Sequence, residues 1–279
     1  MHTQPDISDW IGRTEIATDR IDLRPAMLMQ SVVPSDHVLH EGAKLPPLWN
    51  WLYFHSPSPL EQLGRDGHAA KGGFLPPTDL PRRMWAGGRF RFHGDLCIGD
   101  QVTRRSEILN ITPKTGRSGR LCFVTVGHHY IRDDQTLWHE EHDIVYRDDP
   151  LPDQPAPLPM PAPTGPDVSE TITPSIVMLF RYSALTFNGH RIHYDRSYVR
   201  EVEGYPDLVF HGPLTATLLA GIAQRCSDTR MVAFDYRAVA PLFDTAPFQI
   251  SAKRDADGAT AWATTPQGAL AMQATARFE

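Results

Sequence analysis

Residues 183–195 read SALTFNGHRIHYD, and about fifteen residues later residues 209–214 read VFHGPL. Asn188-Gly189 is a turn signal, so we expect the apolar segment before it to be a helix that ends there. The basic side chains of the bend would then lie near the start of a second apolar helix over residues 214–222. Backbone N–H groups at a helix start are free to bind an oxyanion, which makes this stretch the predicted chemical centre.

The order of elements around this stretch occurs twice along the chain. Each half is predicted to begin with two apolar helices, at 25–33 and 45–54 in the first half and at 174–180 and 214–222 in the second. Four strands are predicted to follow in each half, at 89–92, 101–111, 120–131 and 138–147, and at 231–239, 248–254, 259–264 and 269–278. This order predicts an internal duplication and an α+β fold, in which antiparallel strands pack one face on helices.

A proline-rich segment separates the two halves. Eight prolines lie between Pro150 and Pro166. Proline has a fixed φ and no backbone N–H, so this segment should be extended and semi-rigid. We therefore expect an N-terminal half over residues 1–149, a linker over 150–168 and a C-terminal half over 169–279.

Composition excludes several classes of function. The 279 residues carry a formal net charge of −6, which argues against a generally basic nucleic-acid binder. No stretch approaches the roughly 20 apolar residues that span a bilayer, so no membrane association is expected. The N-terminus lacks the pattern of a secretory signal. Three scattered cysteines (Cys97, Cys122 and Cys226) favour a reducing, cytoplasmic compartment over a disulfide scaffold.

The run at 183–195, followed by HGPL at 211–214, resembles the hydratase-2 motif of MaoC-like hotdog-fold enoyl-thioester hydratases and dehydratases. Two-hotdog members of that family, which include 3-hydroxyacyl-thioester dehydratases and mesaconyl-C4-CoA or itaconyl-CoA hydratases, also contain a segment like RMWAGGRFRF at 83–92. The resemblance implies a double hotdog fold, each half with a long central helix wrapped by a curved antiparallel sheet. It also implies an acyl-CoA substrate and neither a metal nor another cofactor.

The resemblance assigns catalytic roles to three residues. The family has an aspartate five residues before the catalytic histidine, and counting back from His193 places Asn188 in that position. An amide cannot accept a proton. We therefore expect His193 to be the main proton-transfer group and Asn188 to orient water. The family's thioester carbonyl is polarised by a backbone N–H at the start of the central helix, which corresponds to Gly212.

Substrate binding is expected from both halves. His211 and Arg191 lie in or beside the motif. In the first half, Arg89 and Arg91 share a strand face because they are two residues apart, and we expect them to bind an anionic acyl group. The first half has no counterpart of the motif, so it is interpreted as catalytically degenerate.

The histidines at 139 and 142 do not predict a metal site. They are three residues apart in a predicted strand, so they should face opposite sides of the sheet, whereas metallohydrolase ligands lie four apart on a helix.

The expected function is hydration of a branched C5 dicarboxylyl-CoA, such as mesaconyl-C4-CoA or itaconyl-CoA. The alternatives are a 3-hydroxyacyl-thioester dehydratase of fatty-acid metabolism, a non-catalytic acyl-CoA-binding module and a thioesterase. A thioesterase would need a base that Asn188 cannot supply. A homodimer of double-hotdog subunits is also expected.

Overall fold

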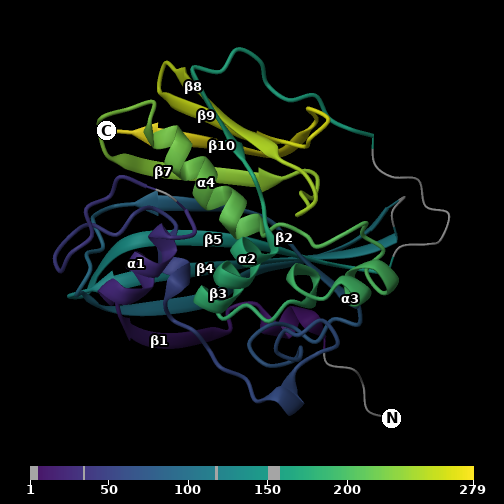
Figure 1. The fold of residues 1–279 in the computed structure, drawn as a ribbon. Coiled ribbons are helices and arrows are strands. Elements are labelled where there is room, and N and C mark those ends of the chain that lie inside the picture. Colours follow the sequence, from purple (N-terminus) through teal and green to yellow (C-terminus); the bar gives the residue numbers. More distant parts are fainter. Residues whose placement is uncertain (1–5, 34, 117–118, 150–157) are drawn as a thin grey trace, which may run out of the picture.

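The computed structural model describes residues 6–33, 35–116, 119–149 and 158–279. All ten strands in these ranges form one antiparallel sheet, in the order β1-β3-β4-β5-β2-β7-β10-β9-β8-β6. Helices lie in front of this sheet in Figure 1, with α4 across the second-half strands β7–β10. Strands and segregated helices confirm the α+β class.

The strands of the first half are long and the helices of both halves are short. The strands are β1 (Thr14–Arg20), β2 (Arg82–Phe92), β3 (Gln101–Gly116), β4 (Gly119–Arg132), β5 (Gln135–Arg147), β6 (Val168–Ile172), β7 (Met231–Ala238), β8 (Phe248–Asp255), β9 (Gly258–Thr264) and β10 (Leu270–Phe278). The α-helices are α1 (Leu23–Gln30), α2 (Ile176–Leu185), α3 (Arg196–Glu201) and α4 (Gly212–Gln224). Short 3₁₀ turns are η1 (Ile7–Trp10), η2 (Trp49–Leu52), η3 (Leu60–Gln62) and η4 (Arg191–His193).

The two halves join where β2 pairs with β7. Two glycines of β2 make this junction possible. A Cβ on Gly87 would lie 2.6 Å from the Tyr236 carbonyl oxygen, and a Cβ on Gly88 would lie 2.5 Å from the Tyr236 hydroxyl. Because contacts this short are not tolerated, only glycine permits the close approach of the strands.

The second half has the predicted arrangement. Helix α4 begins with Gly212-Pro213, and proline is favoured at the start of a helix because its missing N–H has no intrahelical partner there. Nine of its residues are buried, because it packs on β8, β9 and β10. Helix α2 is capped by Ser175, whose side chain accepts from the Met178 N–H. The four strands lie close to the predicted positions.

The first half lacks the second helix that we expected over residues 45–54. Only η2 forms there, and Leu48 and Phe54 on either side of it adopt positive φ values of 70° and 60°. Pro46-Pro47 precedes η2, and prolines in sequence disfavour a continuing helix. The apolar side chains of this segment still enter the core, among them Trp49 and Leu52. The first-half core is thus filled by the eight-residue α1 and a compact loop.

Sequence reasoning missed both outer strands. Among the described residues, β1 pairs only with β3, and β6 only with β8. Residues of β1 alternate between exposed and half-buried, so no apolar stripe marks it. Of the proline-rich linker, residues 150–157 lie outside the described ranges, and Pro161 forms a bridge with Ala269. That the chain divides at 150–168 stays a prediction.

No helix within the described ranges is both long and apolar enough to cross a bilayer.

Candidate active site

A cavity of about 680 Å³ lies between the two halves. The turn η4, the start of α4 and the loop before β2 all contribute to it. Polar residues that line it include Asn50, His55, Ser56, His68, Arg83, Arg104, His142, Arg147, Thr186, Asn188, His190, His193, Glu203 and Thr215. Such a concave site with a few convergent polar groups is the expected location of chemistry.

His193 is held in one tautomer. It is 5% exposed, and its Nδ1 lies 2.7 Å from the carbonyl oxygen of Val209. Because a carbonyl only accepts hydrogen bonds, Nδ1 carries the proton and Nε2 carries a lone pair. The Val209 N–H also donates to the Ile192 carbonyl, so η4 is fixed to the segment that leads into α4. The arrangement presents a base to the cavity.

Burial keeps His193 neutral. Desolvation lowers its pKa to about 4, although the Val209 carbonyl opposes this shift. The pKa values of His190 and His211 are likewise lowered, chiefly by burial. An uncharged imidazole with a free Nε2 can accept a proton from water at neutral pH.

His211 supports His193. Its ring stacks on that of His193, with centroids 3.6 Å apart, and its Nε2 lies 2.9 Å from the Ser183 hydroxyl. It is fully buried and does not line the cavity. The structure therefore places His211 behind His193 and outside the cavity lining, whereas the sequence suggested that it contacts a substrate.

Asn188 and Gly212 both line the cavity with His193. The Asn188 Oδ1 accepts from the His190 N–H at 3.0 Å, a contact that shapes the bend. Gly212 is the first residue of α4, so its N–H has no intrahelical acceptor. The three residues assigned catalytic roles from the sequence are thus brought together.

Arg191 does not line the cavity. It pairs with Asp195, lies over the Tyr198 ring and donates to the Arg65 carbonyl. These contacts tie the catalytic bend to the first half. A role in holding loops fits this placement, and direct substrate binding does not.

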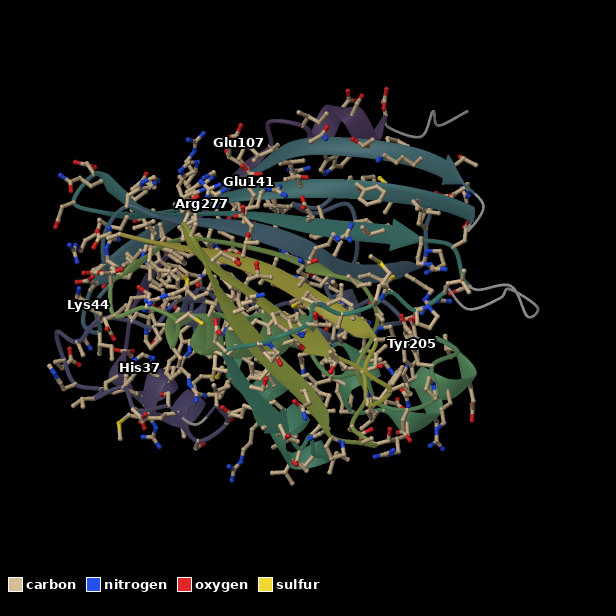
Figure 2. The ribbon with its side chains drawn as sticks, turned by 90° about the horizontal axis from the view of Figure 1, so that it is seen from above. His37, Lys44, Glu107, Glu141, Tyr205 and Arg277 are labelled. Carbon is tan, nitrogen blue, oxygen red and sulfur yellow. The ribbon has the colours of Figure 1, made fainter. Side chains whose placement is uncertain are left out.

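Arg89 and Arg91 also lie away from the cavity lining. Arg89 pairs with Glu141 and Asp143, and Arg91 pairs with Asp235. Figure 2 shows Glu141 over the strands, well separated from the cavity residue Tyr205. Both arginines are therefore occupied by carboxylates of the sheet itself, contrary to our expectation.

A β-bulge explains this difference. The pairing of β2 with β5 shifts between Trp85 and Gly87, so one residue of β2 is extra. A one-residue shift exchanges the two faces of a strand. Arg83 and Trp85, before the bulge, therefore line the cavity, whereas Arg89 after it faces away.

Arg83, Arg104 and Arg147 all line the cavity, and Arg83 is the one whose charge lowers the pKa of His190, beside His193. Within the part of the chain that the structure describes, the Arg83 side chain forms no ion pair and donates no hydrogen bond, whereas its backbone pairs with Tyr146 of β5. Its positive charge lowers the pKa of His68, His142 and His190, although burial lowers each of these pKa values more. It was one of several arginines in the first-half segment, and only the bulge distinguishes it from its neighbours.

Asp66 and His68 were not anticipated at all. They belong to the loop between η3 and β2, and His68 lines the cavity. Only the turn-forming run Gly64-Arg65-Asp66-Gly67-His68 marks this loop in the sequence.

Comparisons with known proteins identify the family. Residues 48–244 match the family of hydroxyacyl-thioester dehydratase type 2. The chain is 47% identical over 268 residues to a mesaconyl-C(4)-CoA hydratase of Chloroflexus aurantiacus, covering 95% of each chain. It is 29% identical over 233 residues to the mitochondrial hydroxyacyl-thioester dehydratase type 2 of Schizosaccharomyces pombe, covering 74% of this chain and 77% of that one.

Solved structures agree on the fold. A MaoC-like dehydratase from Phytophthora capsici has a TM-score of 0.72 at 14% identity, with 99% of this chain and 98% of that one covered. A Mycobacterium tuberculosis protein with a double hotdog fold has a TM-score of 0.58 at 15% identity, with 98% of each covered. The double hotdog fold is confirmed. The chain belongs to the hydroxyacyl-thioester dehydratase type 2 family and is a hydro-lyase, a hydratase or dehydratase that acts on CoA thioesters.

Proposed function

We propose that this hydro-lyase hydrates a branched C5 dicarboxylyl-CoA, such as mesaconyl-C4-CoA or itaconyl-CoA. The observation that carries this proposal is the presence of Arg83, without a carboxylate partner among the described side chains, in the same cavity as His193. A carboxylate at the end of a short acyl chain would form a charge-assisted pair with this guanidinium. The identity to a mesaconyl-C(4)-CoA hydratase supports the same acyl class.

The reaction begins when the enoyl thioester lies with its carbonyl oxygen at the start of α4. Negative charge develops on that oxygen as water attacks Cβ, and the Gly212 N–H stabilises it without reorganisation. The water is held by the Asn188 amide and loses its proton to Nε2 of His193. The remaining step is protonation at Cα, which produces the 3-hydroxyacyl thioester.

The chemistry of each side chain suits the role proposed for it. The amide of Asn188 can hold water as donor and acceptor but cannot take its proton, so His193 is the base. Neutral His193 is in the correct state before turnover because its pKa is about 4. The first half contributes Arg83 and Trp85 to the cavity rather than a second copy of the motif.

A panel of enoyl-CoA thioesters tests the proposal. Mesaconyl-C4-CoA, itaconyl-CoA, crotonyl-CoA and trans-2-decenoyl-CoA would be compared by the loss of absorbance of the conjugated enoyl group. We expect the dicarboxylyl thioesters to have the highest kcat/KM. Preferred turnover of trans-2-decenoyl-CoA would instead indicate a dehydratase of fatty-acid metabolism, and binding of every thioester without turnover would indicate an acyl-CoA-binding module.

Two further parts of the proposal concern the protein's setting. The cysteines at positions 97, 122 and 226 are free, which favours a cytoplasmic location. We further propose a homodimer, because the two halves of one chain already supply the pair of hotdog units and a second copy would add a second site. Sedimentation velocity at micromolar concentration tests the dimer.

A further inference from the structure

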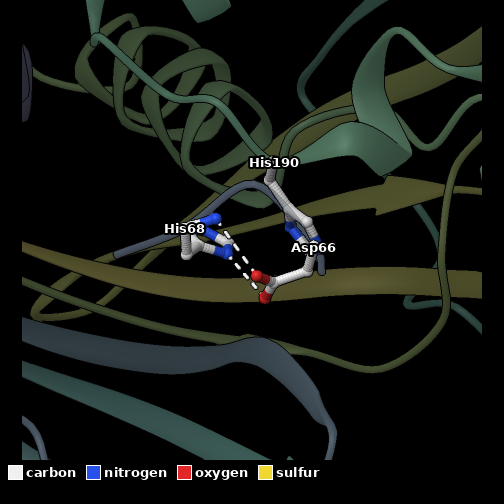
Figure 3. Close-up of side chains that lie close together, drawn as sticks. All are labelled: Asp66, His68 and His190. Carbon is white, nitrogen blue, oxygen red and sulfur yellow. Dashed lines mark hydrogen bonds and ion pairs between the residues drawn. The ribbon is translucent and has the colours of Figure 1, made fainter. Parts of the chain in front are cut away.

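Three titratable side chains form a cluster beside the catalytic histidine. Asp66, His68 and His190 each place one oxygen or nitrogen within 4.8 Å of the others (Figure 3). The ring centroids of His68 and His190 are 4.3 Å apart, and those of His190 and His193 are 5.5 Å apart. A continuous row of imidazoles therefore leads from the first-half loop to His193.

The loop that carries Asp66 and His68 is fixed to the catalytic bend. The Arg191 N–H donates to the Asp66 carbonyl at 2.9 Å. Gly67 has a φ of +88°, and a Cβ there would lie 2.1 Å from the Gly189 carbonyl oxygen. Glycine is required at this position because no other residue allows the two backbones to approach so closely. The distance from this loop to His193 is thus set by backbone contacts.

His68 has the orientation of a proton-transfer group. Its Nδ1 lies 2.9 Å from Asp66 Oδ2, and its backbone N–H donates to Asp66 Oδ1 at 3.1 Å. Burial raises the pKa of Asp66, but the hydrogen bond and charge of His68 outweigh it and keep that pKa below its usual value. The ionised carboxylate makes Nδ1 the donor. Nε2 of His68 then carries the lone pair or the exchangeable proton, and His68 lines the cavity.

Hydration requires two proton transfers. One proton leaves the attacking water, and another must reach Cα on the substrate. Asn188 stands where the family's aspartate would be and can do neither. His193 offers one nitrogen to the cavity, because its Nδ1 is bound to Val209. A second acid–base group in the same cavity would separate the two transfers.

We propose that His68 is this second group, a catalytic residue that exchanges the proton at Cα, and that Asp66 is the positioning residue that orients it. This inference rests on the proposed hydration. In the hydration direction, an O–H bond of water breaks and its proton goes to Nε2 of His193. The oxygen bonds to Cβ, the π electrons move to Cα, and the imidazolium of His68 gives its Nε2 proton to Cα. The proton on His193 returns to His68 through His190 or solvent, so the cycle closes without another reactant.

The charges around His68 agree with this role in the bound state. Burial and Arg83 lower the pKa of His68, whereas Asp66 and Glu203 raise it. The imidazole that lies against His68 is that of His190. A substrate carboxylate paired with Arg83 would neutralise one of the two lowering influences. Binding of the proposed substrate would therefore favour the protonated form of His68 that the step needs.

Exchange of α-protons in D₂O separates the proposed role of His68 from that of His193. The probe is succinyl-CoA, a saturated dicarboxylyl thioester that can exchange its α-protons but has no double bond to hydrate. The first variant is His68→Asn, which keeps an amide N–H near Asp66 but removes Nε2. The other two are Asp66→Asn and His193→Gln. The control is His139→Asn, on strand β5. Exchange would be followed by mass spectrometry, and hydration by the steady-state rate on mesaconyl-C4-CoA.

We expect His68→Asn to slow α-exchange and kcat by at least about 10²-fold with little change in KM. Asp66→Asn should slow both to a smaller extent and alter the pH profile, and His139→Asn should match the wild type. His193→Gln should lose hydration while it keeps most of the exchange. Exchange at the wild-type rate in His68→Asn, with its loss in His193→Gln, would overturn the proposal, because His193 would then make both transfers.

Two other outcomes are distinct. Inhibition of the wild type by EDTA, with recovery on addition of Zn²⁺, would also overturn the proposal, because the cluster would then be a metal site. Failure of the wild type to hydrate any thioester of the panel would contradict the proposed function itself, whatever the exchange results.

Discussion

The imidazole rings of His193 and His211 are stacked, with centroids 3.6 Å apart and planes 18° from parallel. Two positive charges at this separation would repel by on the order of 4 kcal/mol at an effective dielectric constant of 20. Both rings cannot therefore be charged together near neutral pH. The stack, with burial, leaves Nε2 of His193 as a free base throughout the physiological range.

The first prediction concerns this base. His193→Gln should lower kcat by roughly 10² to 10⁴, the usual contribution of general acid–base catalysis. The pKa of His193 is about 4, so kcat/KM of the wild type should lack an acid limb of this group between pH 5.5 and 8. Stopped assays of kcat and kcat/KM as a function of pH, with His139→Gln as a control, check both the loss of kcat and the missing acid limb. An acid limb at pH 6.5 that is absent from His193→Gln would contradict the lowered pKa.

The second prediction concerns stability. An unfolded histidine has a pKa of about 6.5, whereas folded His193 has a pKa of about 4. Between these values the unfolded state binds more protons, so the free energy of unfolding falls as pH falls. His193 alone should account for a loss of about 2 kcal/mol between pH 7 and pH 5. Urea unfolding at both pH values measures this loss.

The control for this stability effect is His193→Gln, in which the loss should be smaller by that amount. His142, whose pKa is lowered to about 3 chiefly by burial, should produce a similar slope that persists in the variant. Equal pH dependence in the wild type and His193→Gln would show that His193 titrates normally.

The sequence predicted elements well wherever an apolar pattern decides them. Most inner strands and α4 alternate or bury a continuous face, and they formed close to the expected residues, whereas β2 begins at Arg82, seven residues before the predicted start. The segment 45–54 has the apolar content of a helix but follows two prolines, and its side chains enter the core from a loop. Edge strand β1 carries no apolar stripe, because neither of its faces is fully buried.

The site was predictable only as far as the motif extends. The bend at 188–193 and the start of α4 are close in sequence, and Asn188, His193 and Gly212 line one cavity. Arg83 faces the cavity because of a bulge, and Asp66 and His68 reach it through contacts with residues more than 100 positions away. Such long-range placement leaves no periodic signal in a single sequence.

The third prediction concerns the acyl carboxylate. Arg83→Gln should reduce kcat/KM for mesaconyl-C4-CoA by an amount equivalent to about 2–5 kcal/mol, as for loss of one partner of a buried charge pair. Turnover of crotonyl-CoA, which has no carboxylate, should hardly change. Arg89→Gln should affect both substrates equally, because Arg89 pairs with Glu141 and Asp143 instead. A uniform loss in Arg83→Gln would assign this arginine to CoA binding or folding.

The fourth prediction concerns Asn188. In Asn188→Asp, a carboxylate oxygen can still accept from the His190 N–H, so the bend should be preserved. Its charge should raise the pKa of His193 by favouring the protonated ring, and the acid limb of kcat/KM should move to higher pH. Asn188→Ala should lower kcat with little effect on KM, because it loses the orientation of water. Wild-type behaviour of both variants would place water activation elsewhere.

The last prediction concerns the oxyanion donor. His211 before Gly212 has φ −62° and ψ 128°, the extended conformation that a residue before proline adopts, and proline is tolerated at the first position of a helix. Gly212→Pro should therefore fold and yet lack the N–H that faces the thioester carbonyl. Its kcat should fall by roughly 10² to 10³, as for removal of one oxyanion donor. The matched control is Gly212→Ala, which keeps the N–H and whose Cβ would lie 3.7 Å from the Trp85 side chain, an ordinary contact. Thermal unfolding would confirm that both variants are folded, and steady-state rates on mesaconyl-C4-CoA would separate them. If alanine reduced kcat as much as proline does, the cost would come from crowding against Trp85, and the thioester carbonyl would have to find its donor at another residue.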